Sequence, residues 1–398
     1  MKKLIYPLLI IVFWGCSHQK TDPIPEEIQE MENLTVYSVD AKPAAEISIK
    51  KDVLYGGSNE VFIGDLGEIA VDSSGRVFIE DTGNLFIHVF EPFGRYLGHF
   101  GRDGRGPGEF SSIKSLQIRD DQLYVFDFRQ NRVNIFNLNT LVIEETISLA
   151  RNRGDHHELR GSYPSVDEFY AGSNNTYIVK FISTGNSIKS DWENIEVKGL
   201  LYLMDDTGDL SEKLVDFKDA IRTQFPVRNT SFDIPLTPFF GNTLIAFSGE
   251  NSMYQAGPDH FLITVYSPNG RYERAFYYPF KKLFLTRESA ISGEVLDELI
   301  INPELIIQNI NSVDLPETWP VLTNMLMDDE NRLWVSTIVK DFEIYEWWVL
   351  EVSGELITTF EWPRNEPIEV IKNGKMYTRQ TDEETGLQQV VRYRVEME

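Results

Sequence analysis

The chain of 398 residues contains a single cysteine, Cys16, which excludes an internal disulfide and a cysteine-based metal site. Basic residues are also few, since 37 lysines and arginines stand against 62 aspartates and glutamates, for a net charge of −25. An acidic body of this kind repels phosphate backbones, so we expect no nucleic-acid partner. Long helical patterns are scarce, and short apolar runs rich in Val, Ile, Tyr, Phe and Trp favour an all-β fold.

Common catalytic motifs are missing as well, including G-x-S-x-G, C-x-x-C and the Walker loop. The only grouped histidines are His156 and His157, which share a loop with Asp155 and Glu158. Adjacent side chains diverge, and the i, i+4 helical pair typical of metal ligands is absent, so these histidines are weak candidates for a metal site. The sequence therefore predicts no cofactor and assigns no catalytic residue, which leaves enzymatic activity open.

The leader is the first positive feature. Residues 1–16 read MKKLIYPLLIIVFWGC, with two lysines, an apolar run too short to span a bilayer stably, and Gly15 directly before Cys16. This pattern resembles the lipobox signal peptide of bacterial lipoproteins. The resemblance implies that Cys16 is lipidated and that the signal peptide is removed before it. An ordinary secretory leader with an incidental cysteine is the alternative.

Residues 17–33, SHQKTDPIPEEIQEMEN, are polar and contain two prolines, so we expect a flexible tether. The lipoprotein resemblance implies three acyl chains, and two or more chains hold a protein durably on a membrane. Under the sorting rule of well-studied lipoproteins, Ser17 after the lipidated cysteine favours the outer membrane. We therefore expect a membrane-anchored protein of the cell envelope, on either the periplasmic or the cell-surface side.

A repeated passage follows. DTGNLFIHVF, starting at Asp81, returns 46 residues later as DFRQNRVNIF, starting at Asp127. A strand-rich period of about 40–50 residues is typical of one β-propeller blade, which has four antiparallel strands, a to d, from the axis outward. Gly, Asn and Asp clusters mark candidate a–b turns near Ser74, Asp121, Asn174, Gly241, Glu330 and Asn373.

Five candidate c–d turns accompany these six a–b turns, so the C-terminal unit lacks an outer strand. Residues 34–50 contain surplus strand-like segments that can supply it. The sequence therefore predicts one domain, 34–398, folded as a six-bladed β-propeller closed by an N-terminal strand. Seven blades are the alternative, because residues 281–316 are long enough to hide strands. Helical spacing within 286–312 predicts a short helical insertion.

The repeated units resemble NHL repeats, whose consensus is approximately V-x-D-x-x-N-x-R-I-x-x-F. The first copy matches at Asp81, Asn84, Ile87 and Phe90, and the second at Asp127, Asn131, Arg132, Val133 and Phe136. With residues 100–110, FGRDGRGPGEF, and the lipobox, the chain resembles six-bladed β-propeller lipoproteins of Gram-negative bacteria. The resemblance implies a fold and an envelope location but no single activity. We interpret Asp81 and Asp127 as turn staples rather than ligand residues.

The long connections are all predicted to be b–c turns or d–a crossings, namely 151–168, 182–198, 217–239, 249–260 and 281–316. These connections share one face of the disc, the working surface, where binding residues are expected. Arginine forks there suit an anionic ligand, and aromatic side chains suit sugar rings or a protein partner. The candidates are Arg102, Arg105, Arg129, Arg153, Arg160, Trp192, Arg228 and Tyr254.

Two readings of these candidates remain open. The arginines can instead pair with nearby carboxylates, and the aromatics can pack the loops onto the disc. We predict a binding module for a glycan, another anionic ligand or an envelope protein. The alternative is a metal-dependent lyase or hydrolase with an axial site on the same face, whose scattered ligands sequence spacing cannot show.

Overall fold

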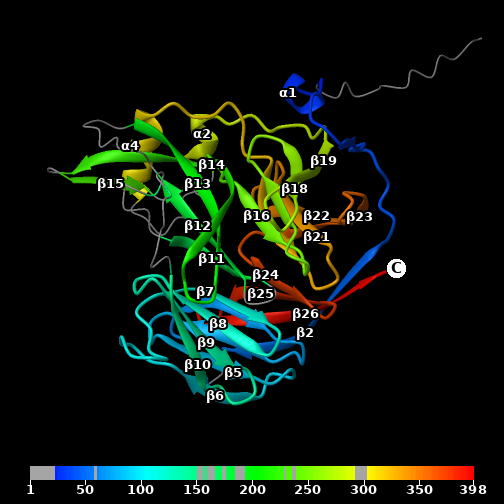
Figure 1. The fold of residues 1–398 in the computed structure, drawn as a ribbon. Coiled ribbons are helices and arrows are strands. Elements are labelled where there is room, and N and C mark those ends of the chain that lie inside the picture. Colours follow the sequence, from blue (N-terminus) through cyan, green and yellow to red (C-terminus); the bar gives the residue numbers. More distant parts are fainter. Residues whose placement is uncertain are drawn as a thin grey trace, which may run out of the picture.

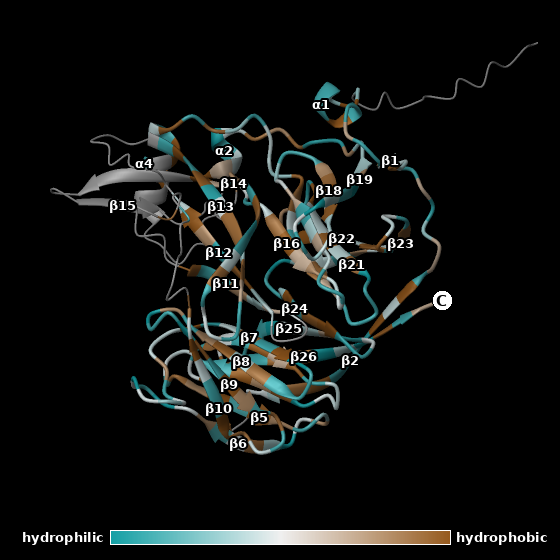
Figure 2. Ribbon diagram, in the orientation of Figure 1, coloured by the Kyte–Doolittle hydropathy of each residue, from teal (hydrophilic) through white to brown (hydrophobic). Residues whose placement is uncertain are grey.

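The computed structural model describes residues 23–57, 61–149, 166–172, 176–183, 193–227, 230–234, 239–291 and 303–398, together with His156 and Leu159. These residues form six small antiparallel sheets arranged in a ring, the six-bladed β-propeller predicted from the sequence (Figure 1). Hydrophobic residues concentrate on the strands, and the turns between them are mostly hydrophilic (Figure 2).

The first three blades follow one another along the chain. Blade 1 contains β3 (Leu66–Val71), β4 (Val77–Asp81), β5 (Phe86–Phe90) and β6 (Tyr96–Phe100). Blade 2 contains β7 (Ile113–Arg119), β8 (Gln122–Asp127), β9 (Arg132–Asn137) and β10 (Ile143–Ser148). Blade 3 contains β11 (Val166–Ala171), β12 (Tyr177–Ser183), β13 (Glu193–Met204), β14 (Leu210–Val227) and a fifth strand, β15 (Thr230–Ile234).

The last three blades include both N-terminal strands. Blade 4 contains β16 (Leu244–Phe247), β17 (Met253–Ala256), β18 (Phe261–Tyr266) and β19 (Tyr272–Tyr278), with β1 (Leu34–Val36) parallel to β19 outside it. Blade 5 contains β20 (Leu322–Met327), β21 (Leu333–Ile338), β22 (Ile344–Leu350) and β23 (Leu356–Pro363). Blade 6 contains β24 (Ile368–Lys372), β25 (Lys375–Thr381), β26 (Gln388–Met397) and β2 (Ile47–Gly56).

The ring closes as predicted, because the N-terminal strand β2 pairs antiparallel with the C-terminal strand β26. The closing strand starts later than the surplus segment at 34–50 indicated, and the first part of that segment, β1, lies on blade 4 instead. Between these strands the N-terminal segment follows the rim of blade 5, where Ala45 N–H donates to Ile357 O (2.9 Å). Residues 33–56 therefore form a belt over blades 4, 5 and 6, visible as the blue chain at the right of Figure 1.

The core is divided into layers between neighbouring blades. Each adjacent pair of sheets, including blades 6 and 1, encloses its own cluster of buried apolar side chains. Trp347 and Trp348 illustrate the arrangement, since adjacent residues of a strand face opposite sides of the sheet. Trp347 packs toward blade 6 and Trp348 toward blade 4, so both serve sheet packing.

The working surface also carries helices. Between blades 4 and 5, the crossing contains α2 (Arg287–Ala290) and α4 (Pro303–Ser312), and Thr286 caps α2 by accepting from Ser289 N–H (3.1 Å). These helices cover a small apolar cluster that includes Trp319, which is buried and packs against Phe342. The short helical insertion predicted near 286–312 is therefore present. A third helix, α1 (Glu26–Gln29), lies in the segment expected to be a tether, and its Ile28 is buried.

Two predicted working-surface loops are wrong. Residues 249–260 include part of the a–b turn of blade 4 and all of β17, because the apolar run LIAF is strand a rather than strand b. The turn predicted at Gly241 therefore precedes strand a, and Asn251, with a positive φ, lies in the a–b turn itself. Residues 217–239 were predicted to be a crossing, but β14 continues to Val227 and forms a hairpin with β15.

Candidate functional site

A groove on the working surface brings together two predicted ligand residues. It lies where the crossing from blade 1 to blade 2 meets the b–c turn of blade 2, and its volume is about 720 Å³. Arg105 comes from the crossing and Arg129 from the turn, although 24 positions separate them in the sequence. The lining residues are Leu85, Asp103, Gly104, Arg105, Ser111, Arg129 and Gln130.

Asp127, at the end of β8, holds the two sides of this groove together. Its buried carboxylate accepts from the backbone N–H groups of Ser111 (3.0 Å) and Ser112 (3.2 Å) and from the side-chain amide of Gln130 (2.6 Å). The same Gln130 amide donates to Gly104 O (2.9 Å). Asp127 is thus the predicted turn staple, and it fixes donors of the groove in place.

The equivalent Asp81 in blade 1 has the same role. Its buried carboxylate accepts from Gly64 N–H and from both the backbone and the side chain of Asn84, each at 3.0 Å. Burial alone would raise the pKa of Asp81, but these hydrogen bonds to the charged form hold that pKa below its usual value. The interpretation of both aspartates as structural residues is confirmed.

Arg132 shapes the crossing that carries Arg105. Its guanidinium donates to three backbone carbonyls of that crossing, Arg105 O (3.0 Å), Gly106 O (2.7 Å) and Glu109 O (2.9 Å). A guanidinium has five N–H donors in a fixed plane, so it can hold several carbonyls at once. The arginine of the NHL-like pattern is therefore a support for the loop, while Arg105 itself extends from that loop.

The charges in the groove are unbalanced. The side chains of Arg105 and Arg129 are exposed, and neither forms an ion pair within the described part of the chain. Arg102, by contrast, is paired with Glu109 (Nε to Oε1, 2.8 Å) and does not line the groove, as the alternative reading expected. Two hydrogen bonds to the charged carboxylate keep the pKa of Glu109 below its usual value. The larger effect comes from the Gly106 N–H and the smaller from the Arg102 guanidinium.

Tyr254 is not a loop residue, contrary to the prediction. It lies in β17, is 3% exposed, and belongs to the apolar cluster between blades 4 and 5. Its position follows from the strand assignment of blade 4 described above. A buried ring in a strand cannot present itself to a sugar or to a partner protein.

His156 contacts a ring rather than other potential metal ligands. It packs edge-on against Tyr202, with the ring centroids 4.7 Å apart. Within the described residues, no three His, Cys, Asp or Glu side chains are grouped so as to hold a metal ion. Six predicted site residues lie outside the described residues, namely Cys16, Arg153, His157, Arg160, Trp192 and Arg228.

Sequence reasoning missed the polar donors beside the two arginines, Ser111 and Gln130. Gln130 follows Arg129 directly, and Ser111 follows the glycine-rich crossing, so both stand next to features that were recognised. Both residues donate to Asp127. An aspartate at the end of a strand accepts from several nearby N–H groups, so its position in the sequence could have indicated them.

The comparisons with known proteins agree with the ring architecture. Residues 57–180 match the family DUF5128, described as a 6-bladed beta-propeller, over blade 1, blade 2, the first strand of blade 3 and part of its second strand. No curated protein matches the chain significantly. None of the helices in the described part of the chain is long and apolar enough to cross a membrane.

Among solved structures, a member of the DUF4221 family from Bacteroides vulgatus is similar in fold, with a TM-score of 0.55 and 11% identity, covering 90% of this chain and 99% of that one. Virginiamycin B lyase from Staphylococcus aureus aligns with a TM-score of 0.39 and 11% identity, covering 87% and 88% of the two chains. The calcium-binding protein regucalcin from Agrobacterium tumefaciens aligns with a TM-score of 0.41 and 10% identity, covering 90% and 96%. At such identities a likeness concerns the fold alone, which hosts unrelated activities.

Proposed function

We propose that this protein is a binding module of the cell envelope that captures an anionic ligand in the groove between blades 1 and 2. One observation carries the proposal: two exposed arginines with no carboxylate partner among the described residues line the same groove in a chain of net charge −25. Guanidinium groups bind carboxylate or sulfate in a two-point fashion. The neighbouring oxygens Ser111 Oγ and Gln130 Oε1 add neutral acceptors for the hydroxyls of a sugar, because the Ser111 hydroxyl and the Gln130 amide already donate within the protein.

An acidic polysaccharide fits this groove better than a small metabolite does. The groove is an open feature of the working surface, and a polymer can continue over the adjacent turns. The exposed ring of Phe128, in the same b–c turn as Arg129, offers an apolar contact for a sugar ring beyond the charged contacts. Lys114 lies over that ring at 4.9 Å, with its ammonium paired to the carboxylate of Asp167 (2.5 Å).

The test is binding of polygalacturonate, with neutral dextran as the reference polymer, to the purified protein at two salt concentrations. We expect binding that weakens with salt, and a loss of at least about tenfold in the double variant Arg105→Ala, Arg129→Ala. The melting temperature should hardly change, because both side chains are exposed. The matched control is Arg95→Ala, which removes an exposed arginine from a c–d turn on the opposite face. Equal binding by the double variant and the unmodified protein would refute the groove as the site.

The envelope location is the second part of the proposal and rests on the lipobox-like leader ending at Cys16. If Cys16 is acylated, cells fed an alkyne-tagged palmitate should incorporate the tag into this protein. The Cys16→Ser variant should carry no tag and should appear in the soluble fraction. Equal labelling of the variant would rule out lipidation at this cysteine.

A further inference from the structure

The axis of the propeller contains a second cavity that is separate from the groove. It lies between the innermost strands of the six blades and has a volume of about 560 Å³, within the range of small-molecule sites. Its lining runs from Glu68, Ser115 and Glu369 within these strands to Gly249 and Lys372 at the a–b turns. The cavity therefore reaches the face opposite the working surface, a face on which the sequence predicted no site.

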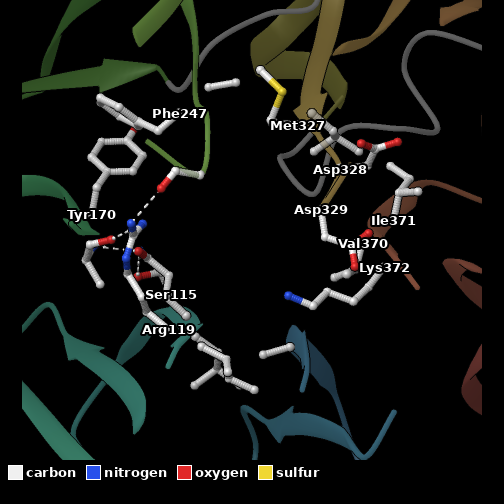
Figure 3. A pocket seen from close by; sticks show the side chains of 18 of the residues that line it. Ser115, Arg119, Tyr170, Phe247, Met327, Asp328, Asp329, Val370, Ile371 and Lys372 are labelled. Atoms are coloured by element: carbon white, nitrogen blue, oxygen red, sulfur yellow. Dashed lines mark hydrogen bonds between the residues drawn. The ribbon is translucent and has the colours of Figure 1, made fainter. Parts of the chain in front are cut away.

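Two cations face each other across this cavity (Figure 3). Arg119, at the end of β7, donates to Gly249 O (2.8 Å) and to Ala171 O (3.4 Å), which fixes its guanidinium across the edges of blades 3 and 4. Both acceptors are neutral carbonyls, so they orient the group without cancelling its charge. Lys372, at the end of β24, points into the cavity from the opposite wall.

The acidic residues at the mouth, Asp328 and Asp329, are not ion-paired with these cations. Asp328 is engaged in its own turn, where it pairs with Arg332 (2.7 Å) and accepts from the indole of Trp334 (2.9 Å). Asp329 accepts from the backbone N–H of Asn373 (3.1 Å). Within the described residues, neither Arg119 nor Lys372 forms an ion pair with a carboxylate, although the chain carries an excess of acids.

The remaining walls suit the body of a small organic molecule. Tyr170, Phe247 and Met327 present apolar surface near the mouth. Deeper in the cavity, the hydroxyl of Ser115 and the carboxyl of Glu68 can bind hydroxyl groups. Burial, with the nearby Glu369 carboxylate, raises the pKa of Glu68 to about 7, so near neutral pH this carboxyl can either donate or accept. Glu369 itself is paired with Arg379 (3.0 Å).

We propose that the axial cavity is a second binding site, which takes a small hydroxylated organic anion, such as a sugar acid or a sugar phosphate. The anionic group lies between Arg119 and Lys372, the carbon skeleton lies against the apolar wall near the mouth, and the hydroxyl groups point toward Ser115 and Glu68. The site does not depend on the polysaccharide groove, because the two share no lining residue and lie on different faces.

Calorimetric titration of the purified full-length protein tests this proposal with three probes: D-glucuronate, D-glucose 6-phosphate and neutral D-glucose. We expect at least one of the two anions to bind measurably and D-glucose to bind at least about tenfold more weakly, because only the anions engage the two cations. The two anionic arms distinguish a carboxylate ligand from a phosphate ligand. Absence of binding by both anions, or equal binding of glucose, would overturn the proposal.

The decisive variant is Lys372→Met, which keeps much of the side-chain volume and removes the charge. It should weaken binding of the anion at least about tenfold, leave the melting temperature unchanged and leave polygalacturonate binding unchanged. The matched control is Lys375→Met, because Lys375 lies directly opposite Lys372 in the β24–β25 hairpin but does not line the cavity. The double variant Arg105→Ala, Arg129→Ala should retain the anion site. Unchanged anion affinity in Lys372→Met would overturn the assignment.

Discussion

The carboxylate of Asp52 lies 2.6 Å from the guanidinium of Arg392, although 340 positions of sequence separate the two residues. Asp52 sits at a register shift between Lys51 and Val53, where β2 bulges against β26. The bulge turns a charged residue of the outer strand toward a partner that is almost fully buried. Arg392 also donates to Pro92 O (2.6 Å) in blade 1, so one side chain joins the closing strand to the next blade.

Replacing Arg392 by alanine should therefore weaken the whole ring. The change removes the close partner of Asp52, leaving only Arg394 at 3.8 Å, and removes one of the two donors to Pro92 O, the other being the Tyr55 hydroxyl. We expect a loss of about 2–4 kcal/mol of unfolding free energy. Urea denaturation measures this loss. The control is Lys50→Ala, which breaks an ion pair to Glu396 between the same two strands, but with both side chains about half exposed. That variant should stay within about 1 kcal/mol of the unmodified protein. Equal effects of the two variants would contradict a special role for the buried pair.

Two turn glycines with a positive φ, Gly270 in the c–d turn of blade 4 and Gly386 in the b–c turn of blade 6, should tolerate alanine according to the space beside them. Gly270 has φ +76°, and a Cβ there would lie 2.5 Å from Leu214 O in the outer strand of blade 3. Gly386, with φ +68°, has no atom within 4 Å of such a Cβ. Alanine at Gly386 should cost about 1 kcal/mol for the left-handed backbone alone, and alanine at Gly270 about 3 kcal/mol or more, because blade 3 must also shift. Thermal unfolding of both variants gives the comparison, and equal melting temperatures would contradict it.

Buried glutamates should make the protein more stable in mild acid than in mild base. Burial raises the pKa of Glu80 to about 7, from an ordinary value of 4.5. Between these two pKa values the folded state binds more protons than the unfolded state, so stability is highest below pH 4.5 for this group and falls as the pH rises to about 7. Glu68, with a pKa raised to about 7 as well, acts in the same direction.

Glu80→Gln isolates this contribution. Glutamine can still accept the N–H of Glu68, which Glu80 now accepts at 3.0 Å, but it carries no charge at any pH. The variant should exceed the unmodified protein in unfolding free energy by up to about 3 kcal/mol at pH 8 and match it near pH 5. The exposed Glu361→Gln serves as the control and should leave the pH dependence unchanged. A gain in Glu80→Gln of the same size at both pH values would refute the titration argument.

The fold was predictable from the sequence because most blades contain an a–b turn and a c–d turn marked by Gly, Asn or Asp. Asp121 and Asn373 mark two-residue connections between strands of clear apolar pattern, and these assignments hold. Blade 4 was mislabelled because LIAF and MYQA are both short apolar strands, so a turn residue on either side fits equally well. The closing strand also lies later in the sequence than predicted. Its sequence, ISIKKDVLYG, contains charged residues, which an outer strand with one exposed face tolerates, so the apolar pattern did not mark its bounds.

The two candidate sites differ in how much of each could be predicted from the sequence. Arg105 and Arg129 were selected because both stand in connections on one face, and that face follows from the strand count alone. Arg119 and Lys372 were not selected, because each ends an innermost strand, and strands a of blades 2 and 6 meet only when the ring is closed. A pair brought together by closure leaves no spacing signal in the chain.

The belt of residues 33–56 has a consequence for biosynthesis. Translation delivers this segment first, yet β2 has no neighbour to pair with until the final ten-residue strand, Gln388–Met397, has been made. A product that terminates early therefore keeps an open hydrogen-bonding edge, which proteases and chaperones can recognise. Closure of the ring therefore requires synthesis of the chain through β26.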